Sequence, residues 1–391
     1  MRRIGDDERR ARLALRHHLA VEARVDDPAT IAGDLVGLHG TTPSTVYLAA
    51  AARMATPDLG AVERALYDER SLVRMLVMRR TVFVLPIELA GIAQAACGRT
   101  LAADQRRRLL QWIRGSDVAD DPEAWLADVE AATLAALERR GEATAAMLAQ
   151  DEPRLRTQVV VAAGTAGATP VAVSWRLLLV LALEGRIVRG RPVGTWLSSQ
   201  YRWAPMETWL PGGLADPPAD EARTELVRRW LRRFGPGTVA DLRWWTGLTG
   251  GQVKGALRGL DAVDVELADG PGIALADDLD PVPAAAPWVA LLPALDPTVM
   301  GWTARGWYLG GHGPRLFDRS GNAGPTVWCD GRVVGGWAHA PDLDVRYQLL
   351  EDVGHEAVVA VEEAAHRLRA TLGTTRVTPS FRTPLERELA G

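Results

Sequence analysis

The sequence predicts an α+β protein made of tandem winged helix-turn-helix units and a strand-rich C-terminal region. In the middle of the chain, a helix, a short helix, a longer helix and a two-stranded wing follow one another, and this order recurs from Asp220. After Trp288, apolar strands separated by turn residues dominate. The length of 391 residues leaves room for roughly two to four such domains.

The composition is typical of a globular protein. Hydrophobic residues make up 47% of the chain and charged residues 24%, the net charge is −4, and Lys254 is the only lysine. Any nucleic-acid binding must therefore come from local arginine patches. No apolar run approaches the roughly 20 residues of a membrane span, and the N-terminus lacks a signal-peptide core. We expect a cytoplasmic protein with no membrane partner.

The two cysteines predict neither a disulfide framework nor a zinc site. Cys97 and Cys329 are far apart and neither belongs to a CxxC motif. A reducing compartment is the simplest setting for such a chain. We expect no metal and no other cofactor.

The first third of the chain is predicted to be mainly helical, with one pair of strands. Helices are expected over about Asp7–Val25 and Thr30–Leu38, and another after Pro43. The apolar, β-branched residues within Ser71–Leu85 favour a strand pair or wing. A long helical stretch is expected over Ile87–Arg114.

Two further units follow, each with the order of a winged helix. In the first, the elements are a short helix from Gly141, a helix over Pro170–Glu184 and a wing that ends near Trp203. In the second, they are a helix over Glu221–Phe234, a short helix capped by Thr238, a helix over Thr249–Leu260 and a strand over Val263–Leu267.

The C-terminal region begins after proline-rich stretches that are predicted to be linkers. Asp330-Gly331, flanked by apolar runs, predicts a hairpin, and a terminal helix over Glu356–Leu372 is expected to end at Gly373. These patterns divide the chain into four domains: 1–125, 126–215, 216–283 and 284–391.

His39 and Thr41 are the leading candidates for a catalytic site. They lie two positions apart, at the end of an apolar segment and just before the helix start at Thr42-Pro43. Backbone N–H donors and a partial positive charge gather at such a helix start, so the site could hold a water or a phosphate. Alternatively, His39 only satisfies a turn and Thr41 shares the capping.

Five stretches, in the same order along nearly the whole chain, resemble the winged-helix DNA-binding proteins whose characterised members are the AlkZ/YcaQ-type DNA glycosylases. The stretches are Leu38–Thr41 with Arg53, Met78–Val84, Leu242–Leu248, Leu291–Pro297 and Asp330–Trp337. The resemblance implies tandem winged helices closed by a small C-terminal β-barrel-like domain, C-shaped around a DNA cleft. It also implies hydrolytic excision of alkylated bases from double-stranded DNA without a metal.

The resembling family carries Gln-x-Gln or Gln-x-Asp where this chain has His39 and Thr41. An N7- or N3-alkylated purine is cationic and departs as a neutral base, so it needs little general-acid help. A neutral His39 could orient or deprotonate the attacking water, and Thr41 could hold that water but supplies no negative charge. Asp296 is either a turn former or a carboxylate that faces the cleft and supplies this charge.

Seven residues are candidate DNA contacts: Arg53, Arg79, Arg80, Lys254, Asp330, Gly331 and Arg332. The two arginines of the Met78–Val84 stretch lie beside a predicted wing, and Arg53 would line the cleft. The hairpin turn either only closes the C-terminal sheet or probes the minor groove with Arg332 on a phosphate.

The function expected from these features is that of a monofunctional DNA glycosylase in base excision repair. Its substrates would be N7- or N3-alkylated purines, including bulky or crosslinked ones, and the enzyme would be a nucleoid-associated monomer. The alternative is a non-catalytic winged-helix binder, either a lesion sensor or a transcriptional regulator. A regulator would usually need a dimer and a palindromic site. A third hypothesis is a family member that has lost its catalytic activity.

Overall fold

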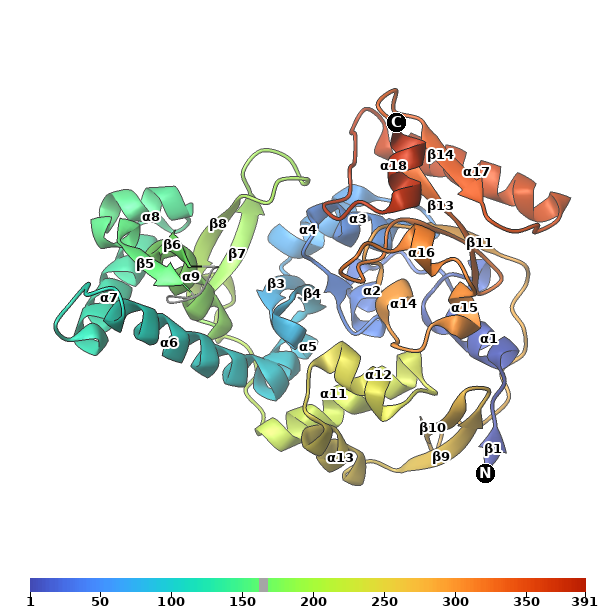
Figure 1. Ribbon diagram of the computed structural model, residues 1–391, viewed down its shortest axis with the longest axis horizontal. Coiled ribbons are helices and arrows are strands. Elements are labelled where there is room, and N and C mark those ends of the chain that lie inside the picture. The colour runs from blue at the N-terminus through green and yellow to red at the C-terminus, as the bar shows by residue number, and fades with distance from the viewer. Residues whose placement is uncertain (162–167) are drawn as a thin grey trace.

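Short helices and small sheets alternate along the chain in the computed structural model, which describes residues 1–161 and 168–391. The protein is therefore α+β, as predicted (Figure 1). The N-terminal elements are β1 (Arg2–Arg3), α1 (Asp6–Arg16), α2 (Pro28–Asp34), β2 (Leu38–His39), α3 (Pro43–Ala51), α4 (Leu59–Tyr67), β3 (Leu72–Leu76), β4 (Val82–Pro86), α5 (Ile87–Ala93) and α6 (Arg99–Arg114).

The predicted strand pair and the helix after Pro43 are confirmed, but two predicted helices are too long. The first ends at Arg16, and only a 3₁₀ turn follows at Val21–Ala23. The second ends at Asp34, because Val36 and Gly37 take positive φ values of 49° and 101° and turn the chain into β2. β2, β4 and β3 then form an antiparallel sheet in that order, which we call the central sheet.

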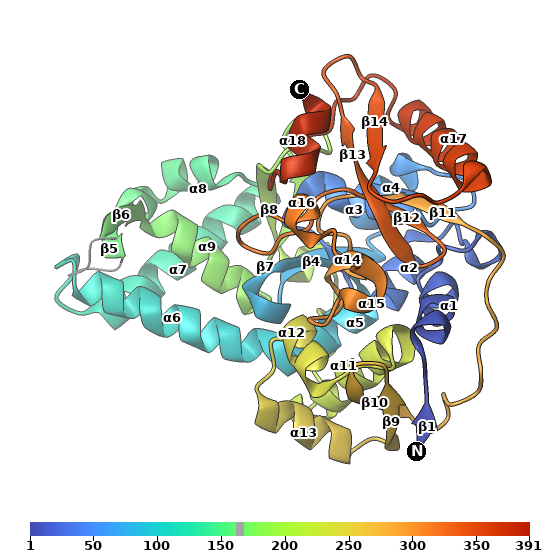
Figure 2. The ribbon, with the colours of Figure 1, turned by 45° about the vertical axis from the view of Figure 1, so that its right-hand side comes forward.

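The second unit has its own hydrophobic core, made of residues between Leu109 and Ile187. It projects from the rest of the molecule in both views (Figures 1 and 2). Its elements are α7 (Pro122–Arg140), α8 (Ala145–Asp151), β5 (Gln158–Val161), β6 (Thr169–Ala172), α9 (Val173–Leu183), β7 (Ile187–Pro192), β8 (Tyr201–Pro205) and α10 (Met206–Trp209). β7 and β8 pair as an antiparallel hairpin, and β7 contacts β3 of the central sheet.

The third unit follows the predicted order closely. Its elements are α11 (Ala219–Phe234), α12 (Val239–Thr246), α13 (Gly250–Arg258), β9 (Ala262–Leu267) and β10 (Gly270–Leu275). Thr238 and Asp241 form a reciprocal capping box at the start of α12. The sequence did not indicate that β1 joins β9 in a parallel pair and ties the N-terminus to this unit.

The C-terminal region contains an open antiparallel sheet in the order β11-β12-β13-β14. Its elements are β11 (Val289–Leu292), α14 (Pro297–Met300), α15 (Gly306–Leu309), α16 (Gly313–Leu316), β12 (Thr326–Cys329), β13 (Arg332–His339), β14 (Val345–Leu349), α17 (His355–Leu372) and α18 (Pro384–Ala390). Within the described residues, β11 and β14 are edge strands, so no closed barrel forms. α17 packs against both edge strands instead.

The largest hydrophobic core contains residues of the first, third and C-terminal regions, from Leu13 to Leu385. The central sheet lies inside this shared core, which fixes the position of β2. In the described part of the chain, no helix is long and apolar enough to cross a membrane.

Candidate functional site

His39 lies at the end of β2, where it pairs with Phe83 of β4. The chain enters this strand through Gly37, where a Cβ would overlap the side chains of Phe83 and Leu85. The imidazole packs against Phe83, with ring centroids 5.1 Å apart, and the residue is only 6% exposed. The local backbone therefore fixes the position of this ring.

Thr41 and Thr42 complete the turn between β2 and α3. The Thr41 side chain is exposed, whereas Thr42 occupies the N-cap position of α3 without a capping hydrogen bond from its side chain. The buried Thr42 hydroxyl has no hydrogen-bond partner among the described residues. His39 and Thr41 are thus close in the chain but differ in exposure, and the residue directly after Thr41 carries an unsatisfied hydroxyl.

Arg79 is the charged neighbour of His39. Its Nη2 lies 3.4 Å from His39 Nε2, which is long for a hydrogen bond. The guanidinium lies over the rings of Trp244 and Trp245, at 4.9 and 5.6 Å from their centroids. Gly247, with a φ of 75°, lets the α12 terminus approach the Arg79 backbone, since a Cβ there would lie 3.0 Å from the Arg79 nitrogen. Trp244, Trp245 and Gly247 thus hold Arg79 against the candidate site.

His39 is neutral at physiological pH. Burial, and then the charge of Arg79, lower the pKa of His39 to about 3. Arginine only donates hydrogen bonds, so its approach to Nε2 assigns the ring lone pair to Nε2 and the proton to Nδ1. His39 Nδ1 is buried and has no partner in the described chain. The site therefore presents one unused N–H donor on a weakly basic ring.

Four arginines around this site have no carboxylate within ion-pair distance among the residues described. We call them the inner arginines: Arg74, Arg79, Arg189 and Arg305. Arg74 donates to the Gly40 carbonyl at 3.0 Å, and Arg74 and Arg189 both stack on Tyr201. Burial, and then the charge of Arg305, lower the pKa of Arg79 to about 10. Arg74 is buried, whereas Arg79, Arg189 and Arg305 are partly exposed, and unpaired cations near a surface are suited to receive an anion.

Sequence reasoning missed Arg74, Arg189 and Arg305. Arg74 is a buried charge in the middle of the apolar strand β3. A charged residue within an apolar strand is unusual, so the sequence could have singled out Arg74 as a candidate site residue. Arg305 stacks on Trp244 and Phe317, at 5.3 and 4.9 Å from the ring centroids. This contact joins residues distant in sequence, so local patterns could not reveal it.

Arg53 and Asp296 do not line a cleft, which corrects the expectation for Arg53 and the cleft-facing alternative for Asp296, whose carboxylate caps α14 instead. Each side chain is 0% exposed, and they form a bidentate ion pair with distances of 2.9 and 2.8 Å. Arg53 also donates to the carbonyl oxygens of His17 and Ala49 and to the Thr298 hydroxyl. The pair links the end of α3 to the start of α14. Each charge is neutralised by the other inside the protein, so neither side chain is available to DNA.

Arg80 and Lys254 are exposed and have no ion-pair partner among the residues that the structure describes. Arg80 follows Arg79 in the turn between β3 and β4, and its charge lowers the pKa of Arg176 on α9, where burial is the larger cause. Lys254 lies on α13. Both remain available to a partner.

The predicted hairpin at Asp330-Gly331 is confirmed, since it joins β12 to β13 with positive φ at both turn residues. However, the turn packs against α1, because a Cβ on Gly331 would overlap the Arg10 side chain. Arg332 forms an ion pair with Glu351 at 2.6 Å. Gly331 is therefore not free to enter a groove, and the Arg332 charge is already paired, while Asp330 is exposed.

Comparisons with known proteins identify the family and the fold of the chain. The sequence model of a family described as DNA glycosylase AlkZ-like matches residues 32–371. The solved structure of the Streptomyces sahachiroi DNA glycosylase AlkZ is similar, with a TM-score of 0.73 and 22% sequence identity, and the match covers 96% of this chain and 99% of that one. A search of curated protein sequences finds no match.

Proposed function

Because the chain belongs to the AlkZ-like DNA glycosylase family, we propose that it hydrolyses the N-glycosidic bond of N7- or N3-alkylated purines in double-stranded DNA. His39 carries the proposal: it is a buried, neutral imidazole with an unused Nδ1–H donor beside Arg79. Arg74 donates to the carbonyl of the next residue, Gly40, and Arg305 shares the Trp244 ring with Arg79. The guanidinium groups of the inner arginines suit phosphodiester oxygens.

The charge of the site fits a cationic leaving group. When the bond between the sugar and an N7- or N3-alkylated purine breaks, the electron pair goes to the base, which leaves neutral and needs no general acid. A water then bonds to the anomeric carbon and releases its proton to solvent. Bulky and crosslinked adducts follow the same chemistry, so they belong to the proposed substrate class.

In this mechanism His39 positions the water rather than deprotonating it. A pKa of about 3 makes the ring a poor base at physiological pH, but the Nδ1–H group can hold a water or a sugar oxygen in place. The exposed Thr41 hydroxyl is the second contact for that water. Positive charge that develops on the sugar is stabilised by DNA phosphates, which the inner arginines draw to the site.

The finer architecture belongs to this proposal. The three units with the order helix, helix, helix and hairpin act as winged helices, and together with the C-terminal sheet they form a C-shaped surface around the duplex. One chain supplies all units, so the enzyme works as a monomer associated with the nucleoid. Arg80 and Lys254 contact the DNA backbone.

The purified protein is expected to release 7-methylguanine from a duplex that carries N7-methylated guanines. Chromatography of the free bases measures the release, and an unmethylated duplex is the control. Release from the methylated duplex only is the expected result. Tight binding without any released base would refute the catalytic proposal.

That contradicting outcome defines the second candidate, a non-catalytic DNA-binding protein. A specific observation favours it: among the residues that the structure describes, Arg79 is the only charged group that shifts the pKa of His39, and no carboxylate does. A site without negative charge stabilises an oxocarbenium ion poorly unless phosphates supply that charge. The base-release assay separates the two candidates.

Replacing Arg79 by Gln is expected to weaken binding to duplex DNA about tenfold. The slope of log K against log salt should fall by roughly one, because one fewer phosphate contact releases one fewer counterion. The reason is the loss of an unpaired guanidinium beside His39. Arg79→Lys should restore only part of the affinity, since it keeps the charge but lacks the planar face that stacks on Trp244. Fluorescence anisotropy at several salt concentrations measures both quantities.

The matched control is Arg369→Gln, which removes the charge of an exposed arginine that is paired with Asp344 on the C-terminal sheet. This variant should bind DNA like the wild type. If Arg79→Gln also binds like the wild type, Arg79 does not contact DNA.

A further inference from the structure

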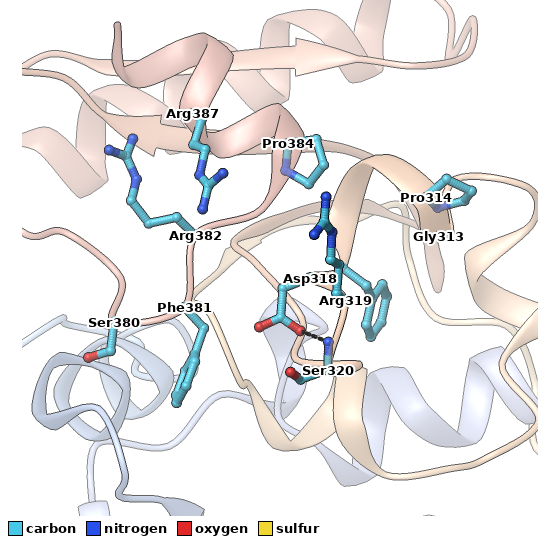
Figure 3. A pocket seen from close by; sticks show the side chains of 11 residues that line it. Gly313, Pro314, Asp318, Arg319, Ser320, Ser380, Phe381, Arg382, Pro384 and Arg387 are labelled. Carbon is cyan, nitrogen blue, oxygen red and sulfur yellow. Dashed lines mark hydrogen bonds between the residues drawn. The ribbon is translucent and has the colours of Figure 1, made fainter. Parts of the chain in front are cut away.

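A cavity of about 830 Å³ lies in the C-terminal region, between the loop that follows α16 and the segment that leads into α18. Arg319 comes from the loop, and Arg382 and Arg387 come from the chain terminus. Figure 3 shows the side chain of Arg387, which comes from α18, and that of Arg319, which comes from the loop, among the residues that line this cavity. Two segments that are distant in sequence thus bring cationic groups to one place.

Some of the charged side chains that line the cavity have a partner within the protein. Arg382 is paired with Glu386 at 2.6 Å. The Asp318 carboxylate accepts hydrogen bonds from the backbone nitrogens of Ser320 and Asn322, at 2.8 and 2.9 Å, and from the Asn322 side chain. These bonds fix the loop and occupy the Asp318 carboxylate, the only one among the described residues that line the cavity.

Arg319 and Arg387 are the two cations that remain. Both are exposed, and neither has a carboxylate within ion-pair distance in the described ranges of the chain. The neighbouring Arg315, by contrast, is paired with Glu388. Two free guanidinium groups on one cavity, with the Ser320 and Ser380 side chains on its lining, provide donors for an oxyanion.

The cavity is connected to the candidate active site by stacked side chains. Phe317 lines the cavity and contacts the Arg305 guanidinium, which also lies over Trp244. Trp244 in turn carries Arg79, the neighbour of His39. A line of arginines without carboxylate partners in the described chain therefore runs from His39 through Arg305 to the cavity.

We propose that this cavity binds a phosphodiester group of the DNA strand whose damaged nucleotide reaches His39. The inference rests on the proposed function, because it takes DNA as the substrate. The recognised chemistry is a phosphate oxyanion, which free phosphate shares. Bidentate guanidinium contacts suit such an oxyanion, and an anchor away from His39 positions the strand without touching the reacting bond.

The test is the double variant Arg319→Gln/Arg387→Gln, measured against an undamaged duplex by anisotropy over a range of salt concentrations. A phosphate bound by both arginines predicts that the slope of log K against log salt falls by about 0.9. The control is Arg346→Gln/Arg369→Gln, which removes the same charge from arginines that are paired with Asp342 and Asp344. The control should keep the wild-type slope.

A wild-type slope in the Arg319/Arg387 double variant overturns the proposal, and so does an equal loss of slope in the control. Calorimetry with inorganic phosphate tests the alternative that the cavity binds free phosphate. If only the wild type binds phosphate while the DNA slopes of wild type and variant agree, the cavity holds a free anion and the DNA assignment is overturned. Both arginines are exposed, so thermal melting should show an intact fold.

The undamaged duplex separates this test from the proposed function. A protein that releases no alkylated base but loses salt dependence in the Arg319/Arg387 variant is not a glycosylase, yet it has the phosphate site. A protein that releases the base and shows no change in slope is a glycosylase without it.

Discussion

Replacing His39 by Ala is expected to slow the release of 7-methylguanine from duplex DNA about a hundredfold, the usual cost of misplacing a reacting group. His39 is fixed against Phe83, and its Nδ1–H group is a buried donor without a partner among the described residues. Removing the ring removes the group that holds the water, whereas Arg79 and the other inner arginines stay in place. DNA affinity should therefore change little. Single-turnover base release and anisotropy measure the two effects separately.

The control variant is His39→Gln, which keeps an N–H donor of similar reach. It should retain more activity than His39→Ala, and both variants should melt near the wild-type temperature. If His39→Ala releases the base at the wild-type rate, the imidazole has no part in the reaction. Equal loss in both variants together with weaker binding would indicate a structural role instead.

The pH profile gives a second readout of the same residue. With a His39 pKa of about 3, the imidazole stays neutral, with its single proton on Nδ1, throughout the range from pH 9 down to pH 5. Its protonation therefore causes no loss of rate over that range. A general base with the ordinary histidine pKa of about 6.5 would lose about tenfold in rate per pH unit below that value. Such a fall, on a duplex that stays intact, would contradict the positioning role.

Local sequence rules predicted those elements whose determinants lie within a few residues. The N-cap at Thr238, the helix after Pro43 and the hairpin at Asp330-Gly331 all depend on side chains and backbone angles close in the chain. The second helix was overextended because its apolar pattern continues into β2. There, tertiary pairing with β4 determines the conformation of Leu38–His39.

The candidate site was predictable in part for the same reason. His39 and Arg79 belong to stretches that carry the family resemblance, and the structure brings these two together. The contacts that define their environment come from Trp244 and Arg305, more than 150 residues away in the chain. Such contacts depend on how the third unit packs against the central sheet, which residue spacing does not encode.

Arg53 is the case where the sequence hypothesis and the structure make opposite predictions. Replacing it by Leu is expected to lower the apparent free energy of unfolding by about 3–5 kcal/mol, because Asp296 would remain as an unpaired charge in the interior. Denaturant unfolding followed by tryptophan fluorescence measures this loss. Under conditions where the variant is folded, its affinity for DNA should equal that of the wild type.

The double variant Arg53→Leu/Asp296→Leu tests whether the ion pair is the cause. Removing both charges leaves no unpaired ion at this position, so the loss of stability in the double variant should be clearly smaller than the sum of the two single losses. Some loss should remain, because Arg53 also satisfies the carbonyls of His17 and Ala49. A DNA contact predicts the reverse pattern, in which Arg53→Leu weakens binding and leaves stability unchanged. That result would require Arg53 to leave its pair with Asp296 when DNA binds.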